Sequence, residues 1–221
     1  QNMDVDPLCR LPLVLEKEGL ARAVLSELRL ENAEPDLTAL KSYVKSVDGA
    51  ADPLRVALVG KYTAMPDAYL SVTEALRHAC AQAGAKPRID LVDAEKITPD
   101  TAEDLLGVYD AIVVPGGFGD RGVDGMIVAA RYAREHGATV VVVEQKIALL
   151  SQYADMLVVV DEGRIRFADA PAQVLEHSDE LKAIGVNCPR STTLMNRLRA
   201  EGLYQGPSVR NVREAREALE E

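Results

Sequence analysis

The chain has 221 residues, of which 48% are hydrophobic and 27% are charged, and its formal net charge is −10 at pH 7. This composition predicts a folded chain with one sizeable core, filled by aliphatic side chains because Phe occurs twice and Trp is absent. The negative charge disfavours nucleic acids and anionic membrane surfaces as partners, since both are polyanions. No apolar run approaches the roughly 20 residues that span a bilayer, so we expect no membrane insertion.

Cysteine and histidine give no sign of a metal or disulfide framework. Cys9, Cys80 and Cys188 have spacings typical of neither a disulfide pattern nor a zinc site. The three histidines also lack metal-ligand spacing. We therefore expect no metal and no cofactor, and, with no secretory leader at the start of the sequence, a cytoplasmic protein. No sequence feature fixes the oligomeric state.

Hydrophobic periodicity predicts helices first and then a regular alternation. The expected N-terminal helices cover 11–28 and 37–47. The expected strands cover 55–59, 88–92, 111–114, 139–143 and 156–160, and the helices between them cover 68–83, 99–106, 123–135 and 147–153. Such alternation with almost wholly apolar strands predicts a doubly wound, mostly parallel sheet of about five strands, buried on both faces. The fold class is thus α/β, a flavodoxin-like or Rossmann-like three-layer sandwich with extra N- and C-terminal helices.

The end of the alternation contains a turn and a further strand. Asp161-Glu162-Gly163 has turn composition, and residues 163–168 are expected to form an antiparallel edge strand. For the two carboxylates we favour solvated turn residues over acid–base catalysis. Further helices are expected at 172–176, 179–184, 192–201 and 212–220. These patterns divide the chain into a helical linker segment at 1–53, an α/β core at 54–177 and a helical extension at 178–221.

The strongest indication of a site is one glycine-rich stretch. Pro115-Gly116-Gly117-Phe118-Gly119-Asp120-Arg121-Gly122 directly follows the expected strand 111–114. A glycine-rich turn at the carboxyl end of a parallel strand exposes backbone N–H groups to a ligand, so the stretch predicts a small polar ligand. The alternative is a structural turn in which the glycines supply positive φ.

This stretch resembles the start of the glutaminase domain of CTP synthases. The other segments that carry the resemblance are Asp4-Val5-Asp6, 11–20, Glu34-Pro35-Asp36-Leu37, Val59-Gly60-Lys61-Tyr62 and 66–72. The resemblance runs from about Asn2 to His136 and implies hydrolysis of glutamine, which supplies ammonia for the ATP-dependent conversion of UTP to CTP. It assigns the Gly117 N–H to an oxyanion hole, in a loop shaped by Gly116 and Phe118. For Lys61 it leaves a ligand role and an interface role open.

The resemblance stops before the nucleophile. In that family the next strand ends in a Gly-x-Cys-x-Gly turn, and counting on from Gly117 puts Glu144 at the cysteine position. A carboxylate cannot act as the thiolate, and none of the three cysteines has the required glycine context. The amidoligase domain and the His-Glu pair of the triad are expected to be absent too. We therefore predict no catalytic residue and an inactive chain from a family of ligases.

From about Gly137 the chain resembles the C-terminal part of ABC transporter ATPases of the cobalt or energy-coupling type. The segments that carry this second resemblance are 139–146, 153–155, 158–165 and 171–175. It places Gln145 at the position of the switch histidine that contacts the γ-phosphate in those ATPases. The sequence holds no Gly-x-x-x-x-Gly-Lys-Ser/Thr phosphate loop, so ATP binding is not expected.

Together the two resemblances predict a chimera-like core, glutaminase-like at 54–136 and ABC-ATPase-like at 137–177. A right-handed crossover would place strand 139–143 beside strand 111–114, so that the Gly116-Gly117 loop and Glu144 meet at one edge of the sheet. Two alternatives to a glutaminase stay open: a catalytically silent hybrid or engineered α/β scaffold, and an ABC transporter ATPase fragment without a phosphate loop.

Overall fold

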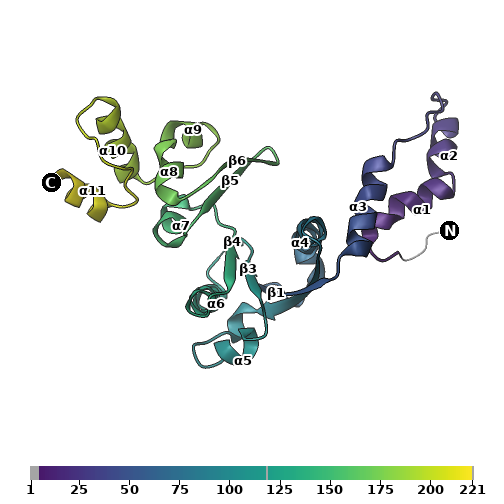
Figure 1. The fold of residues 1–221 in the computed structure, drawn as a ribbon, viewed down its shortest axis with the longest axis horizontal. Coiled ribbons are helices and arrows are strands. Elements are labelled where there is room, and N and C mark those ends of the chain that lie inside the picture. Colours follow the sequence, from purple (N-terminus) through teal and green to yellow (C-terminus); the bar gives the residue numbers. More distant parts are fainter. Residues whose placement is uncertain (1–4, 118, 221) are drawn as a thin grey trace. The chain divides into compact units, whose positions relative to one another are not determined.

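The computed structural model of the protein describes residues 5–117 and 119–220. The chain divides into two compact units, residues 1–142 and residues 143–221. The first unit carries a helical N-terminal part and a parallel sheet, and the second carries a two-stranded sheet and several short helices (Figure 1).

The N-terminal part of the first unit is helical, as the periodicity predicts. It consists of a 3-10 helix η1 (Leu8–Arg10) and the helices α1 (Leu11–Lys17), α2 (Leu20–Glu27) and α3 (Thr38–Gly49). Gly19 separates α1 from α2 with a φ of 80°, which glycine adopts without the steric cost that a Cβ brings. Pro12 lies in the first turn of α1, where its missing N–H costs no helical hydrogen bond.

The sheet of the first unit has four parallel strands in the order β2-β1-β3-β4. The strands are β1 (Asp52–Gly60), β2 (Ala85–Asp93), β3 (Ala111–Val114) and β4 (Thr139–Val142). The α/β fold class is therefore confirmed. The prediction that strand 139–143 lies beside strand 111–114 is also confirmed, because Val114 of β3 is paired with Val142 of β4.

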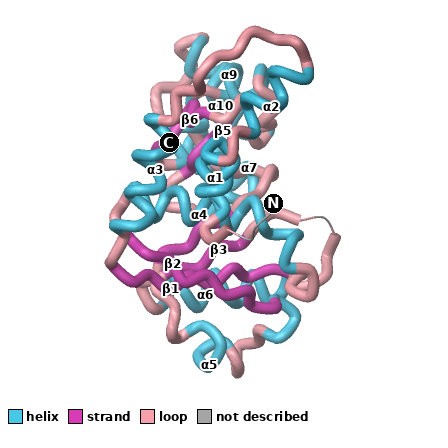
Figure 2. Tube along the Cα trace, turned by 90° about the vertical axis from the view of Figure 1, so that its right-hand side faces the viewer, coloured by secondary structure: helices cyan, strands magenta, loops and turns pink. Residues whose placement is uncertain are grey.

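Helices connect and cover the strands. The connections are η2 (Pro66–Tyr69) with α4 (Leu70–Gln82), η3 (Ala94–Lys96) with α5 (Ala102–Leu106), and α6 (Val123–Glu135). Helices α4 and α5 lie on opposite sides of the sheet (Figures 1 and 2). One face of the sheet packs Val59 and Ile112 against the small side chain of Ala129 on α6, which permits close helix–strand contact. The result is a core centred on β1 and β3.

Strand β4 departs from the prediction that every strand of the sheet is buried on both faces. Val141 and Val142 are 49% and 39% exposed, whereas Val113 and Val114 of the neighbouring β3 are buried. The reason is topological. Strand β4 is at the end of the strand order, so only one neighbouring strand covers it. Apolar composition alone cannot distinguish such an edge strand from a central one.

The prediction of about five strands in one sheet is wrong for the strand after β4. Strand β5 (Leu157–Asp161) pairs with β6 (Arg164–Asp169) as an antiparallel hairpin in a separate two-stranded sheet of the second unit. Glu162 and Gly163 form the turn with φ values of 48° and 73°, which confirms the expected turn and the antiparallel strand after it. This local turn closes a hairpin without a long crossover, and that pairing replaces the expected parallel one.

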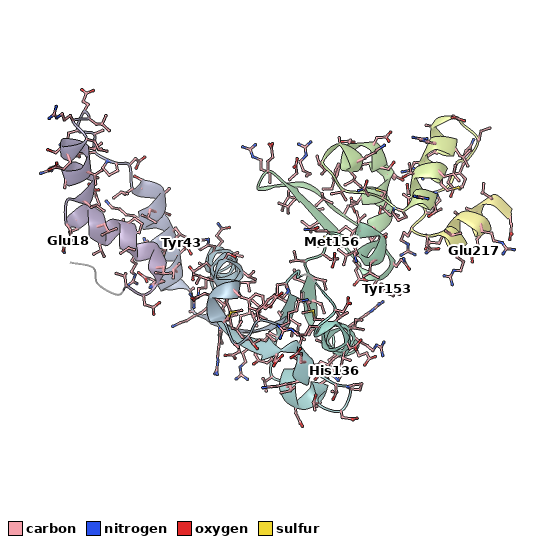
Figure 3. The ribbon with its side chains drawn as sticks, turned by 180° about the vertical axis from the view of Figure 1, so that it is seen from behind. Glu18, Tyr43, His136, Tyr153, Met156 and Glu217 are labelled. Atoms are coloured by element: carbon pink, nitrogen blue, oxygen red, sulfur yellow. The ribbon has the colours of Figure 1, made fainter. Side chains whose placement is uncertain are left out.

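The helices of the second unit are short. They are α7 (Ile147–Tyr153), α8 (Pro171–Glu176), α9 (Ser178–Ala183), α10 (Arg190–Ala200) and α11 (Val212–Glu220). Leu157 and Val159 on β5 pack with Leu175 and Leu181 in a core of this unit's own. Tyr153, the last residue of α7, and Met156, the residue before β5, are exposed (Figure 3). Between residues 5 and 220, with residue 118 set aside, no helix has the length and apolarity needed to cross a membrane.

Candidate functional site

Three chain segments meet at the carboxyl edge of the parallel sheet in the first unit. Lys61 directly follows β1, Glu95 lies in η3 directly after β2, and the glycine-rich stretch follows β3. Ligands of open parallel sheets bind at this edge, because the loops that leave the strands converge there. The predicted position of the glycine-rich stretch, directly after a parallel strand, is confirmed, whereas its role as a ligand site stays a prediction.

Tyr69 fixes the backbone at the end of β1. Its hydroxyl accepts hydrogen bonds from the backbone N–H groups of Lys61, at 3.0 Å, and Tyr62, at 3.2 Å. Gly60 makes this possible, since a Cβ at that position would lie 2.5 Å from Cζ of the Tyr69 ring. Both amide groups, which lie beyond the end of β1, thus donate to one buried side chain.

The Lys61 side chain extends beneath the glycine-rich stretch. It is only 6% exposed, and its Nζ donates a hydrogen bond of 2.9 Å to the carbonyl oxygen of Gly119. A Cβ on Gly117 would lie 2.9 Å from Lys61 Cε, closer than ordinary van der Waals contact. The Lys61 stem can therefore take this position because Gly117 has no side chain.

Arg121, in the glycine-rich stretch, makes a second contact with the residue that follows β1. Its Nη2 donates to the Lys61 carbonyl oxygen at 2.6 Å, and its guanidinium lies 5.5 Å from the centre of the Tyr62 ring. Its Nε is 3.6 Å from a carboxylate oxygen of Glu95. The last contact joins two exposed side chains, so its contribution to stability is small. Arg121, Tyr69 and Glu95 received no role from the sequence, although Arg121 and Tyr69 lie inside the segments that carry the resemblance.

The glycines of the loop serve two different purposes. Gly119 and Gly122 adopt positive φ values of 79° and 73°, as the structural-turn alternative requires. Gly116 and Gly117 do not adopt positive φ, and both are exposed. The turn alternative therefore accounts for Gly119 and Gly122, whereas Gly116 and Gly117 present exposed backbone at the sheet edge. Phe118, the third residue assigned to this loop, lies outside the described residues.

Glu144 and Gln145 belong to the second unit, between β4 and α7. A carboxylate oxygen of Glu144 accepts hydrogen bonds from the backbone N–H groups of Gln145, at 2.8 Å, and Lys146, at 3.0 Å. In a nucleophile elbow, the N–H of the residue after the nucleophile contributes to the oxyanion hole. In this chain the corresponding N–H, that of Gln145, donates to the Glu144 side chain instead. The meeting of Glu144 with the Gly116-Gly117 loop stays a prediction, as does the switch position of Gln145.

The three cysteines are poorly suited to nucleophilic attack. Burial raises the pKa of the Cys188 thiol to about 11, and the nearby Asp179 carboxylate acts in the same direction. Burial also raises the pKa of Cys80 and of Cys9. A raised thiol pKa lowers the fraction of thiolate at neutral pH, and the thiolate is the nucleophile.

The histidines make local contacts. His136 ends α6, stacks on Tyr132 with ring centroids 4.0 Å apart, and lies 3.7 Å from a Glu103 carboxylate oxygen (Figure 3). His177 contacts Glu180 at 2.8 Å. Among residues 5–117 and 119–220, no group of three or more His, Cys, Asp and Glu side chains has the arrangement of a metal site.

Comparison with known proteins gives a family match to part of the chain. Residues 64–141 match the family model described as "Glutamine amidotransferase class-I". The match includes the glycine-rich loop and ends three residues before Glu144. Residues 64–141 are therefore similar to part of a class-I glutamine amidotransferase domain.

Three CTP synthases are similar over the same share of the chain. The chain is 45% identical to the enzyme of Levilactobacillus brevis and 49% identical to that of Prochlorococcus marinus, over 135 residues in each case. It is 49% identical over 134 residues to the CTP synthase of a Synechococcus strain. Each match covers 61% of this chain and 24–25% of the relative, so the chain spans about a quarter of the length of these relatives.

A solved structure described as the glutaminase domain of Trypanosoma brucei CTPS with bound acivicin is 35% identical. The match covers 46% of this chain and 41% of the chain in that structure, with a TM-score of 0.40. The fold assignment of the first unit rests on the strand order and parallel pairing of its own sheet.

Proposed function

We propose that the first unit is a CTP-synthase-type glutaminase segment that binds the side-chain amide of glutamine at the Gly116-Gly117 loop, and that the chain alone does not hydrolyse it. The observation that supports binding is the exposed backbone of Gly116 and Gly117 at the carboxyl edge of the sheet, within the segment that matches the amidotransferase family. Backbone N–H groups in such a place stabilise a carbonyl oxygen on which negative charge develops. Glutamine is the substrate class that the family match implies.

The proposed lack of hydrolysis rests on Glu144. The ungapped count from Gly117 puts it at the position of the cysteine nucleophile, and its carboxylate accepts hydrogen bonds from two backbone N–H groups of its own turn. The carboxylate cannot act as the thiolate. The two N–H groups that donate to it are not free to donate to an oxyanion. The cysteines do not replace it, because each has a raised thiol pKa.

For the second unit we propose descent from the C-terminal part of an ABC transporter ATPase, which makes the whole chain a hybrid. Two observations support this: the resemblance changes near Gly137, and the division between the two compact units falls close by, after Val142. Because the phosphate loop is absent from the sequence, this unit contributes no nucleotide hydrolysis. In this proposal the hybrid acts as a binding scaffold in the cytoplasm.

Nuclear magnetic resonance on the uniformly 15N-labelled full chain tests the proposed binding. Addition of L-glutamine should shift the backbone amide signals of Gly116 and Gly117, and D-glutamine at the same concentration should not. Gly202 in the second unit is an internal control, because it lies in open surroundings outside the matched segment. Loop signals that stay unchanged at millimolar L-glutamine would contradict the proposal.

A further inference from the structure

The buried lysine at the end of β1 has a role that the family match does not assign, since the match begins at residue 64. Lys61 is 6% exposed, although a lysine side chain is rarely buried to this extent without a specific partner. Its Nζ donates to the Gly119 carbonyl oxygen at 2.9 Å. The ammonium is therefore engaged by the glycine-rich loop and not directed to solvent.

Two further contacts join Lys61 to the glycine-rich stretch. Beneath it, the Lys61 stem approaches Gly117 so closely that a Cβ there would lie 2.9 Å from Cε. From the loop, Arg121 donates to the Lys61 carbonyl oxygen at 2.6 Å. The two residues thus form a closed link between the end of β1 and the loop after β3, which we call the Lys61–Arg121 clasp.

The position of the clasp is itself fixed. The Tyr69 hydroxyl accepts the N–H groups of Lys61 and Tyr62, and the absence of a Cβ on Gly60 leaves room for the tyrosine ring. The Lys61 backbone therefore cannot shift without breaking these two hydrogen bonds. Because the hydrogen bond to Gly119 is charge-assisted and part-buried, it holds the loop more firmly than a fully exposed lysine would.

We infer that Lys61 is the positioning residue of the glycine-rich loop: through Gly119 it holds the Gly117 backbone in the orientation that receives the carboxamide. This inference rests on the proposed function for its ligand, glutamine, but not for the clasp itself. Lys61 makes no contact with the reacting atoms in this account. Its effect passes through its contacts with Gly117 and Gly119.

Hydrogen exchange of backbone amides in the full chain tests the inference, with Lys61→Met as the variant. Methionine keeps an unbranched stem beneath Gly117 and removes the ammonium. We expect the hydrogen-bonded amides nearest the clasp, which serve as the loop amides, to exchange on the order of tenfold faster, as loss of one charge-assisted hydrogen bond implies. These are the amides of Tyr62, bonded to the Tyr69 hydroxyl, and of Val123, bonded to the Asp120 carbonyl oxygen. The amides of Leu58 and Ile112 in the core should keep their rates.

Two further variants make the result specific. Lys86→Met removes an exposed lysine from β2 of the same sheet and should change none of these rates. Arg121→Met removes the other hydrogen bond of the clasp. Because the Arg121 side chain is exposed, this variant tests the clasp even where Lys61→Met lowers the yield of folded protein. It should accelerate the same loop amides.

The outcomes separate the clasp from the ligand. Loop-specific acceleration together with about tenfold weaker L-glutamine binding by Lys61→Met supports the inference. Loop-specific acceleration in a protein whose wild type does not bind L-glutamine supports the clasp and overturns the proposed function. Unchanged loop rates in both variants, or equal acceleration of loop and core amides, would overturn the inference, because Lys61 would then contribute only to general stability.

Discussion

Gly125 on α6 offers a sharp test of how the first unit is packed. The residue is buried, and a Cβ built on it would overlap the carbonyl oxygen of Ala94 and lie 2.8 Å from the carbonyl carbon. The carbonyl oxygen of Ile97 would be 3.2 Å away. These are backbone atoms of η3 and of the residue that follows it, so they cannot rotate aside as a flexible side chain would.

Two effects compete in Gly125→Ala, and their sizes decide the sign. Alanine in a helix interior is favoured over glycine by about 1 kcal/mol. Overpacking costs about 1–3 kcal/mol and sometimes more, and backbone overlap belongs at the upper end of that range. We therefore expect a net loss of about 2 kcal/mol, which lowers the melting temperature of the first unit by about 4–8 °C.

Thermal unfolding followed by circular dichroism measures the effect, with Gly49→Ala as the matched control. Gly49 ends α3, has no positive φ, and has no atom within 4 Å of a built Cβ. Its replacement should leave the melting temperature unchanged or raise it slightly. A Gly125→Ala variant as stable as the wild type would contradict the close approach of α6 to η3.

Three further outcomes follow from the site. Glu144→Cys should not restore ammonia release from glutamine, because the activating base is not supplied; turnover by this variant would show that the base is present after all. Magnesium-ATP in excess should leave the melting temperature unchanged, whereas a reproducible rise of several degrees would reveal a nucleotide site. Cys188, with its pKa raised to about 11, should react with iodoacetamide at pH 8 at least tenfold more slowly in the folded chain than in urea, and its rate should rise with pH until about 11; equal rates would mean that the thiol is not buried.

Local sequence signals predicted local structure well. Strand β3 and helices α6, α7 and α11 begin and end at the expected residues, because each has a clear period and a recognisable boundary. The turn at Glu162 and Gly163 was also readable from composition. What failed was the partner of β5. Whether a strand joins a distant sheet or its sequence neighbour depends on competition between pairings, which periodicity does not report.

The candidate site shows the same division. The place of the loop followed from glycines after a strand, whereas the Lys61–Gly119 contact joins residues 58 positions apart and requires the register of β1 against β3. Glycine at 117 suggested a turn or a ligand, and the structure gives a third reason, the approach of the Lys61 stem. The hydrogen bonds that Glu144 accepts from Gln145 and Lys146 have a local signal, an acidic residue in the turn between β4 and α7, whereas the family resemblance indicates only a missing nucleophile at that position.

The central claim is that this chain can hold glutamine but cannot hydrolyse it, and ammonia release tests it most directly. Purified full chain at micromolar concentration should be incubated with L-glutamine and the ammonia measured enzymatically over hours. The account predicts no release above the spontaneous background, and the same rate for the wild type and for Cys80→Ala and Cys188→Ala. Sustained release by the wild type that either cysteine variant abolishes would contradict it, because that cysteine would then be the nucleophile.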